Sequence, residues 1–97
     1  MRERDVEAYL VQQVKARGGL VRKVLWIGRR GAPDRLVLLP GHWPFLLELK
    51  APGRKPSEQQ AREMARLASF GLPTAWADSF ARVDAAIAEM ARPESAR

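Results

Sequence analysis

The stretch GAPDRLVLLPGHWPFLLELKAPGRK, from Gly31 to Lys55, contains two short apolar segments separated by a turn. The first, Leu36 to Leu39, predicts a strand that is covered on both faces. The second, Phe45 to Lys50, predicts a strand that returns beside it. This second strand includes Glu48 and Lys50, and charged side chains are rare in a strand that enters a core. The hairpin therefore combines a core pattern with two polar residues that need a separate explanation.

Alternate side chains of a strand share one face, and this rule separates the two patterns. We expect one face to build the core through Phe45, Leu47 and Leu49. Glu48 and Lys50 share the opposite face near the end of the strand. Asp34 stands at the start of the neighbouring strand, across the hairpin, so its carboxylate can approach that of Glu48.

The remaining elements are predicted from apolar spacing, capping residues and glycine or proline stops. In chain order they are a helix over Glu3 to Arg17, a strand over Val21 to Ile27, the two hairpin strands, a helix beginning at Ser57, a strand over Thr74 to Ala77, and a helix marked by Phe80, Val83, Ile87 and Met90. The order α-β-β-β-α-β-α predicts an α/β fold with a small mixed β-sheet flanked by helices. We expect a single domain over residues 1–91 and a C-terminal tail over residues 92–97.

Composition excludes several classes of protein. The 97 residues include no cysteine, which excludes disulfides and thiolate zinc sites. No apolar run approaches the roughly 20 residues that a membrane-spanning helix needs, and the first residues are charged. One histidine cannot complete a Ser/His/Asp triad at this site, and no glycine-rich nucleotide-binding loop is present. We expect a cytoplasmic protein with no membrane partner and no nucleotide cofactor.

The charge distribution points to a polyanionic partner. Seventeen Lys and Arg face eleven Asp and Glu, for a net charge of +6. Ten of the basic residues lie between Ala8 and Ser57, where the only acids are Asp34 and Glu48. Such an excess favours nucleic acid, whose phosphates attract Lys and Arg. On net charge alone, a basic surface kept for solubility is an equal alternative.

Two carboxylates held close together repel each other unless a cation lies between them. Carboxylate oxygens suit Mg²⁺ or Mn²⁺, which also bind phosphate oxygens and lower the pKa of a bound water. Lys50 is then placed to orient the attacking water and to stabilise charge on the phosphorus. The alternative is an Asp34 that caps a loop and a Glu48–Lys50 surface ion pair, worth less than about 1 kcal/mol.

A longer pattern carries a resemblance to a known family. Pro33-Asp34, followed after thirteen intervening residues by Glu48-Leu49-Lys50, is similar to the PD-(D/E)xK nuclease signature. With a helical Glu7 and the segment Ser57-Glu58-Gln59-Gln60, the chain resembles the VRR-NUC family of virus-type replication and repair nucleases, of the stand-alone phage or bacterial type. The likeness covers about Glu3 to Ala88 and implies a restriction-endonuclease-like core.

The resemblance implies a metal site. Asp34 and Glu48 would bind Mg²⁺ or Mn²⁺ with the backbone carbonyl of Leu49, and Glu7 would contact the ion directly or through water. Without the resemblance, Glu7 reads as a solvent-exposed acid near a helix N-terminus.

The resemblance also gives roles to residues beside the metal. Lys50 would serve the attacking water, and Gln60 would lie near the site while it caps its helix, with Gln59 a weaker candidate. Five basic residues flank the site in sequence and are candidates for phosphate contacts, although ordinary surface charge explains each equally well: Arg29, Arg30, Arg35, Arg54 and Lys55.

Together these features predict a metal-dependent, structure-specific endonuclease that hydrolyses DNA phosphodiesters. The resemblance implies a homodimer that acts on branched DNA such as the four-way (Holliday) junction, in the cytoplasm of a bacterial or phage-infected cell. The sequence itself shows neither the dimer nor the junction preference. The competing classes are a non-catalytic basic DNA-binding module derived from a nuclease and a protein-interaction adaptor.

Overall fold

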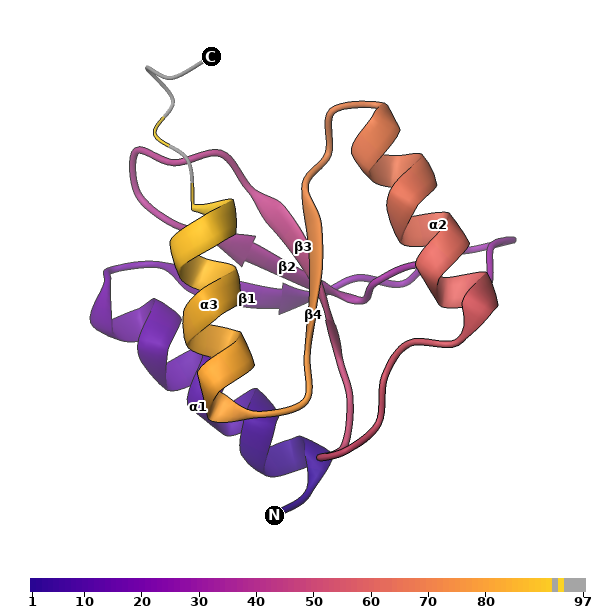
Figure 1. Ribbon diagram of the computed structural model, residues 1–97. Coiled ribbons are helices and arrows are strands. Elements are labelled where there is room, and N and C mark those ends of the chain that lie inside the picture. Colours follow the sequence, from indigo (N-terminus) through magenta and orange to yellow (C-terminus); the bar gives the residue numbers. More distant parts are fainter. Residues whose placement is uncertain (92, 94–97) are drawn as a thin grey trace.

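The predicted order of elements is confirmed by the computed structural model, which describes residues 1–91 and 93. The elements are α1 (Glu3–Ala16), β1 (Leu20–Lys23), β2 (Arg35–Leu38), β3 (Phe45–Leu49), α2 (Glu58–Ser69), β4 (Thr74–Ala77) and α3 (Phe80–Met90) (Figure 1). Apart from Pro93, the predicted tail over residues 92–97 lies outside the described residues. Within the described residues, no helix combines the length and apolar character needed to span a membrane.

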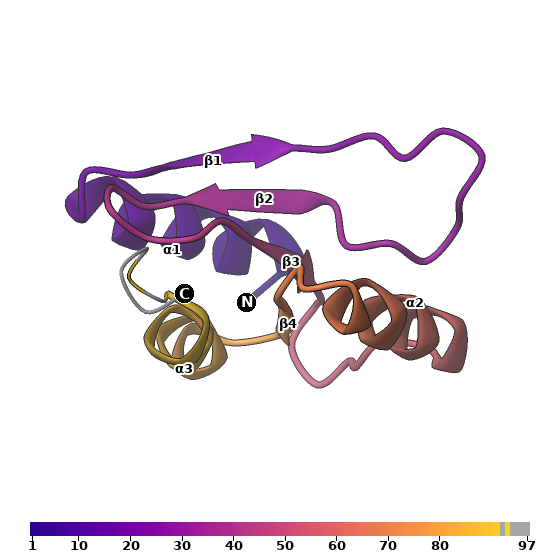
Figure 2. The same ribbon diagram turned by 90° about the horizontal axis from the view of Figure 1, so that it is seen from above.

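The four strands form one mixed sheet in the order β1-β2-β3-β4. β2 pairs antiparallel with both β1 and β3, whereas β3 and β4 are parallel, which requires the crossover through α2. Figure 2 shows α1 and α3 on one side of β3 and β4, and α2 on the other side. The same view shows the long loop between β1 and β2 extending beyond the sheet on the side of α2.

The core lies between the sheet and the pair α1 and α3. The spacing of four residues places apolar side chains of α1 on one face, and β3 contributes the face predicted from alternation. The central residues of this core are fully or almost fully buried: Val6, Leu10, Val14, Phe45, Leu47, Leu49, Val83 and Ile87. Each such side chain stabilises the fold by about 1.5–3 kcal/mol. This core fixes β3, and with it the direction in which Glu48 points.

Two predictions about the strands are wrong in detail. The first strand ends at Lys23 instead of Ile27, because its partner β2 begins at Arg35 and the ladder ends at the Lys23–Arg35 pair. The segment Leu36 to Leu39 is not covered on both faces, since Val37 is buried whereas Leu36 is half-buried. On that face of the sheet α2 packs against β4, at the far end of the sheet from β1.

Candidate active site

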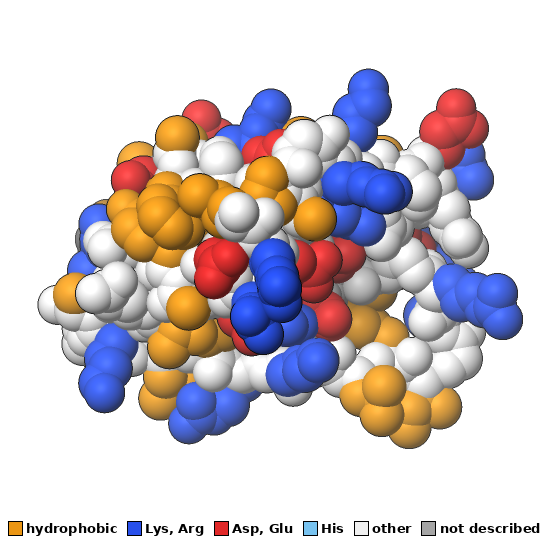
Figure 3. All heavy atoms as spheres, turned by 90° about the horizontal axis from the view of Figure 1, so that it is seen from below, with side chains coloured by type: hydrophobic (Ala, Val, Ile, Leu, Met, Phe, Trp, Pro, Cys, Tyr) orange, Lys and Arg blue, Asp and Glu red, His pale blue; other side chains and the backbone are white. Residues whose placement is uncertain are grey.

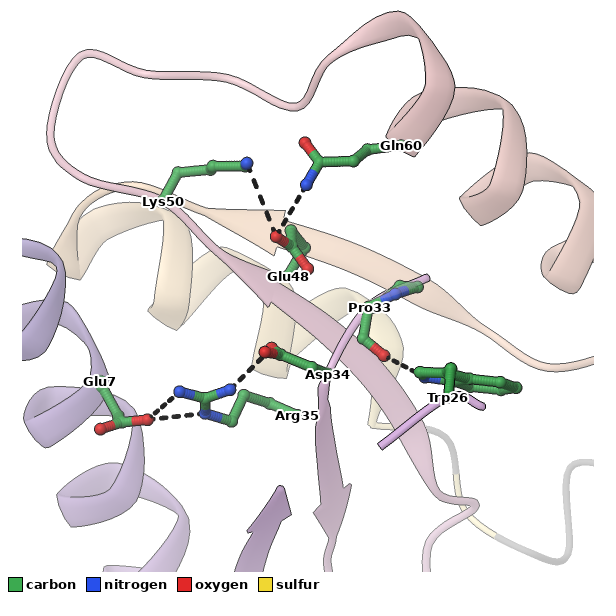
Figure 4. A network of polar contacts seen from close by, with 8 residues as sticks. All are labelled: Glu7, Trp26, Pro33, Asp34, Arg35, Glu48, Lys50 and Gln60. Atoms are coloured by element: carbon green, nitrogen blue, oxygen red, sulfur yellow. Dashed lines mark hydrogen bonds and ion pairs between the residues drawn. The ribbon is translucent and has the colours of Figure 1, made fainter. Parts of the chain in front are cut away.

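The site is built where β3 ends. Glu48 points away from the core toward α2, and its side chain is 13% exposed. Its Oε2 atom accepts a hydrogen bond from Gln60 Nε2 at 3.2 Å and lies 3.6 Å from the Lys50 ammonium (Figure 4). Lys50 reaches this position because it stands two residues beyond Glu48 and its backbone N–H still bonds to Ala77 of β4. Strand alternation thus brings the acid and the ammonium together as predicted.

Gln60 is held in place by the beginning of α2. Its backbone N–H donates to Ser57 Oγ at 3.1 Å, and its side-chain Oε1 accepts from the Ser57 N–H at 2.9 Å. This is the predicted capping box, and it leaves the amide NH₂ group of Gln60 to bond Glu48. The two readings of Gln60, as helix cap and as neighbour of the site, therefore both describe its geometry.

The electrostatics of Glu48 reflect the second acid. Burial raises the pKa of Glu48 above its ordinary value, and the negative charge of Asp34 raises it further, whereas the Lys50 ammonium lowers it. Because Arg35 lies opposite Leu47 in the β2–β3 ladder, Asp34 and Glu48 are neighbours across the two strands, as the hairpin predicts. A cation placed between them would relieve this repulsion.

Asp34 lies directly before β2 and is joined to an acid from α1 by one arginine. The Arg35 guanidinium pairs with Asp34 Oδ1 at 2.7 Å, and Arg35 Nε donates to Glu7 Oε2 at 2.6 Å (Figure 4). A second guanidinium nitrogen also pairs with Glu7. Although burial lowers the pKa of Arg35, its contacts with Glu7 and Asp34 raise it above its ordinary value overall. Glu7 is therefore held near Asp34 because both carboxylates pair with the Arg35 guanidinium.

The position of Arg35 corrects one prediction. Arg35 was a candidate for phosphate contact, but its side chain is only 10% exposed and pairs with two carboxylates. It lies opposite Leu47 in the β2–β3 ladder, so it faces α1 instead of solvent. The predicted phosphate contact at Arg35 is therefore wrong, and Arg35 is a residue that positions the acids.

The donor set suits a hard divalent cation with few protein ligands. No group of three or more His, Cys, Asp or Glu is assembled as a metal site within the described part of the chain. What the chain offers is the carboxylate pair Asp34 and Glu48 with the neighbouring Leu49 carbonyl. Arg35 pairs with one oxygen of Asp34 and also holds Glu7. Mg²⁺ is commonly bound through one or two carboxylates, with water and substrate phosphate as its other ligands. The residues present therefore fit the implied ion.

Basic side chains lie close to acidic ones on one face of the molecule. Figure 3 shows acidic side chains gathered near the middle of the face that it views, with Lys and Arg side chains over and around them. Arg30, Arg54 and Lys55 are exposed, and Arg29 pairs with Glu63 at 2.7 Å while its side chain stays 52% exposed. These four predicted residues remain available to phosphate.

Two further arginines were missed by the sequence analysis. Arg62 and Arg66 of α2 line a hollow of about 770 Å³ together with Arg29 and Arg30. The spacing of four residues on a helix, which places both on one face, was the signal that could have identified them. The hollow lies between α2 and the loop that joins β1 to β2.

Comparisons with known proteins identify the family of the chain. No family model matches the chain. The "Putative nuclease p44" of Acyrthosiphon pisum secondary endosymbiont phage 1 is 48% identical over 71 residues, which cover 73% of this chain and 76% of that protein. A solved structure of a "VRR_NUC domain" matches with a TM-score of 0.78 and 39% identity, over 89% of this chain and 94% of the other. The chain therefore belongs to the VRR-NUC family of nucleases.

Proposed function

We propose that this protein is a Mg²⁺- or Mn²⁺-dependent endonuclease that hydrolyses phosphodiester bonds in branched or otherwise structured DNA. The observation that carries the proposal is the convergence of Asp34, Glu48 and Lys50 at the end of β3, in a chain that belongs to a nuclease family. Repelling carboxylates beside an ammonium are an arrangement that a divalent ion and a phosphate would complete.

The side chains have distinct roles in the proposed reaction. Asp34 and Glu48, with the Leu49 carbonyl, would hold the ion, which when bound lowers the pKa of a water ligand and stabilises charge on the scissile phosphate. Lys50 would donate a hydrogen bond to the attacking water and stabilise negative charge on the phosphate oxygens. Gln60 would keep the Glu48 carboxylate in one orientation through its 3.2 Å hydrogen bond.

The basic surface supports DNA as the substrate. Arg29, Arg30, Arg54 and Lys55 lie on loops that border the site, and phosphate contacts of this kind position a nucleic acid without reading its sequence. We therefore include recognition of DNA shape in the proposal.

The proposal extends to a homodimer on four-way junctions, in the cytoplasm of a bacterial or phage-infected cell. Two strands of like polarity must be cut to resolve such a junction, and a two-fold symmetric pair of sites suits that requirement. The family resemblance supports this assignment.

Cleavage of labelled DNA tests the proposed function. A four-way junction, a flap and a matched duplex are incubated with Mg²⁺, Mn²⁺ or EDTA. We expect metal-dependent cutting that is strongest on branched DNA and is lost in Asp34→Ala and Lys50→Ala. Lys15→Ala, at an exposed lysine in the last turn of α1, controls for loss of positive charge and should cut normally. Binding without cutting under every metal would instead identify a non-catalytic DNA-binding module.

A further inference from the structure

The loop that joins β1 to β2, residues 24–34, presents two aliphatic side chains to solvent. Leu25 is 86% exposed and Ile27 is 90% exposed, the highest values for large hydrophobic residues in the described part of the chain. Figure 2 shows this loop extending beyond the sheet. Two such exposed apolar side chains, only two positions apart on a projecting loop, are more than the scattered exposure that is ordinary for a protein surface.

The base of this loop is anchored beside the site. The Val24 N–H donates to the Asp34 carbonyl at 2.9 Å, and Trp26 Nε1 donates to the Pro33 carbonyl at 2.8 Å (Figure 4). These bonds connect the two arms of the loop across its width. Leu25 therefore lies on an arm of the loop that is hydrogen-bonded to the opposite arm, and that opposite arm ends at Asp34, a proposed metal ligand.

The loop is also anchored to α2. Arg29 pairs with Glu63, which is buried, at 2.7 Å. Gly31 has a φ of +82°, and a Cβ at this position would meet the Gln59 backbone oxygen at 3.3 Å, so the chain passes very close to the helix. The loop thus has contacts on both arms that keep Leu25 and Ile27 in a defined place.

A hollow lies between Leu25 and the proposed metal ligand Asp34. Lys23, Leu25, Trp26 and Asp34 are among the residues that line a space of about 470 Å³. A molecule bound at the proposed metal site would therefore have Leu25 beside it. Leu25 and Asp34 therefore face a common space.

The charge around Leu25 and Ile27, together called the aliphatic tip, indicates which kind of partner the loop can bind. No acid occurs between Val24 and Pro33, whereas Arg29 and Arg30 belong to the loop and Arg62 and Arg66 face it across the larger hollow. A symmetric contact between two copies of this loop would bring like charges together. A polyanion that also has flat apolar faces satisfies both the arginines and the aliphatic tip, and a nucleic acid strand has both properties.

We propose that Leu25 and Ile27 form a wedge that packs against unstacked bases at the branch of the DNA substrate, while the arginines of the loop and α2 hold the flanking phosphates. This inference rests on the proposed function, and it adds that the unstacked bases at the branch are the feature of the substrate that is recognised. Apolar side chains inserted between bases must offset the loss of stacking. That loss is smallest where bases already lack a stacked neighbour, so the wedge favours branches over continuous duplex.

Binding measurements with a fluorescent base test the wedge directly. Every protein carries Lys50→Ala so that the DNA stays intact, and 2-aminopurine is placed either at the branch of a four-way junction or within a duplex. We expect binding to raise the fluorescence at the branch only. The double variant Leu25→Ser/Ile27→Ser should lose this rise and about tenfold of the preference for junction over duplex. Phe70→Ser, at a residue 80% exposed at the far end of α2, is the matched control and should change neither quantity.

Two results would overturn the wedge. One is an unchanged fluorescence rise and an unchanged affinity ratio in the double variant. The other is a smaller mass in sedimentation for the double variant than for the parent protein, which would identify a second copy of the chain as the partner of the tip. Neither readout needs cleavage, so loss of the proposed nuclease function and loss of the wedge are distinguishable.

Discussion

Arg35 donates its Nε–H to Glu7 at 2.6 Å, which connects α1 to the beginning of β2. The same guanidinium holds Asp34 at 2.7 Å, so one cation sits between two acids that come from different elements. Its own side chain is 10% exposed, and the carboxylate side chains are about 40% exposed. Arg35 therefore neutralises acids near the site and fixes where they point.

Replacing Arg35 should destabilise the protein. Arg35→Met leaves Glu7 and Asp34 without their common partner, and we expect a loss of about 2 kcal/mol in the free energy of unfolding. This is less than for a fully buried pair, because both acids retain contact with water. Urea unfolding measures the loss. Arg30→Met, at an exposed arginine five positions away, should change stability by less than about 0.5 kcal/mol, and an equal loss in both variants would contradict this account.

Variants of Gln60 and Ser57 distinguish the role of Gln60 in capping α2 from its role beside Glu48. Gln60→Glu keeps an oxygen that can accept from Ser57 but removes the donor to Glu48, so we expect cleavage to fall by about tenfold. Ser57→Ala removes the cap acceptor but keeps that donor, so we expect a loss of about 1 kcal/mol in stability with little loss of cleavage. Thermal unfolding and initial cleavage rates of both variants give the comparison. Parallel losses of stability and rate would mean that Gln60 acts only as a cap.

Local pattern was sufficient for most of the fold and for part of the site. The alternation of β3 and the hairpin turn fix which side chains face the core, so the approach of Lys50 to Glu48 follows from sequence. The apolar run after Lys23 also looks like a strand, but a strand exists only where a partner is available. β2 supplies four residues, and Leu25 and Ile27 are left outside the ladder.

The role of Arg35 could not be predicted in the same way. Its neighbours in sequence place it in a basic field, which favours a phosphate contact. Its actual partner Glu7 is 28 positions away and reaches it only because α1 packs across the sheet. The hollow that joins Arg62 and Arg66 to Arg29 depends likewise on how α2 lies beside a loop. Relations of this kind come from tertiary packing, and single-sequence periodicity does not contain them.

The raised pKa of Glu48 predicts a pH-dependent stability. Burial is the larger cause and the charge of Asp34 the second. The folded, metal-free protein therefore keeps a proton on Glu48 to higher pH than the unfolded chain does. In the unfolded chain the pKa of this carboxyl group has its ordinary value of 4.5. The resulting stabilisation is complete below that value and is lost as pH rises through the raised folded-state pKa.

Glu48→Gln removes this titration. In EDTA we expect Glu48→Gln to melt at a higher temperature than the parent protein at pH 8, and the advantage to shrink as pH falls toward 4. Its cleavage activity should be lost, because a neutral amide is a poor ligand for a hard cation. Glu58→Gln, whose side chain is 96% exposed, controls for the removal of one negative charge. A Glu48→Gln protein that is less stable than the parent at pH 8 would contradict the assigned cause.

Metal binding should be visible in the stability of the protein without any DNA. At a Mn²⁺ concentration one hundred times the dissociation constant, binding to the folded state alone adds about 2.7 kcal/mol, and EDTA should reverse the effect. Asp34→Asn should abolish the rise in melting temperature. Glu7→Gln should reduce it less, because two nitrogens of Arg35 hold Glu7 in the metal-free protein, whereas one holds Asp34. Glu89→Gln, at an exposed acid of α3, should keep the full response. An equal rise in Asp34→Asn and Glu89→Gln would mean that the ion is bound elsewhere on the protein, and Asp34 could not then be its ligand.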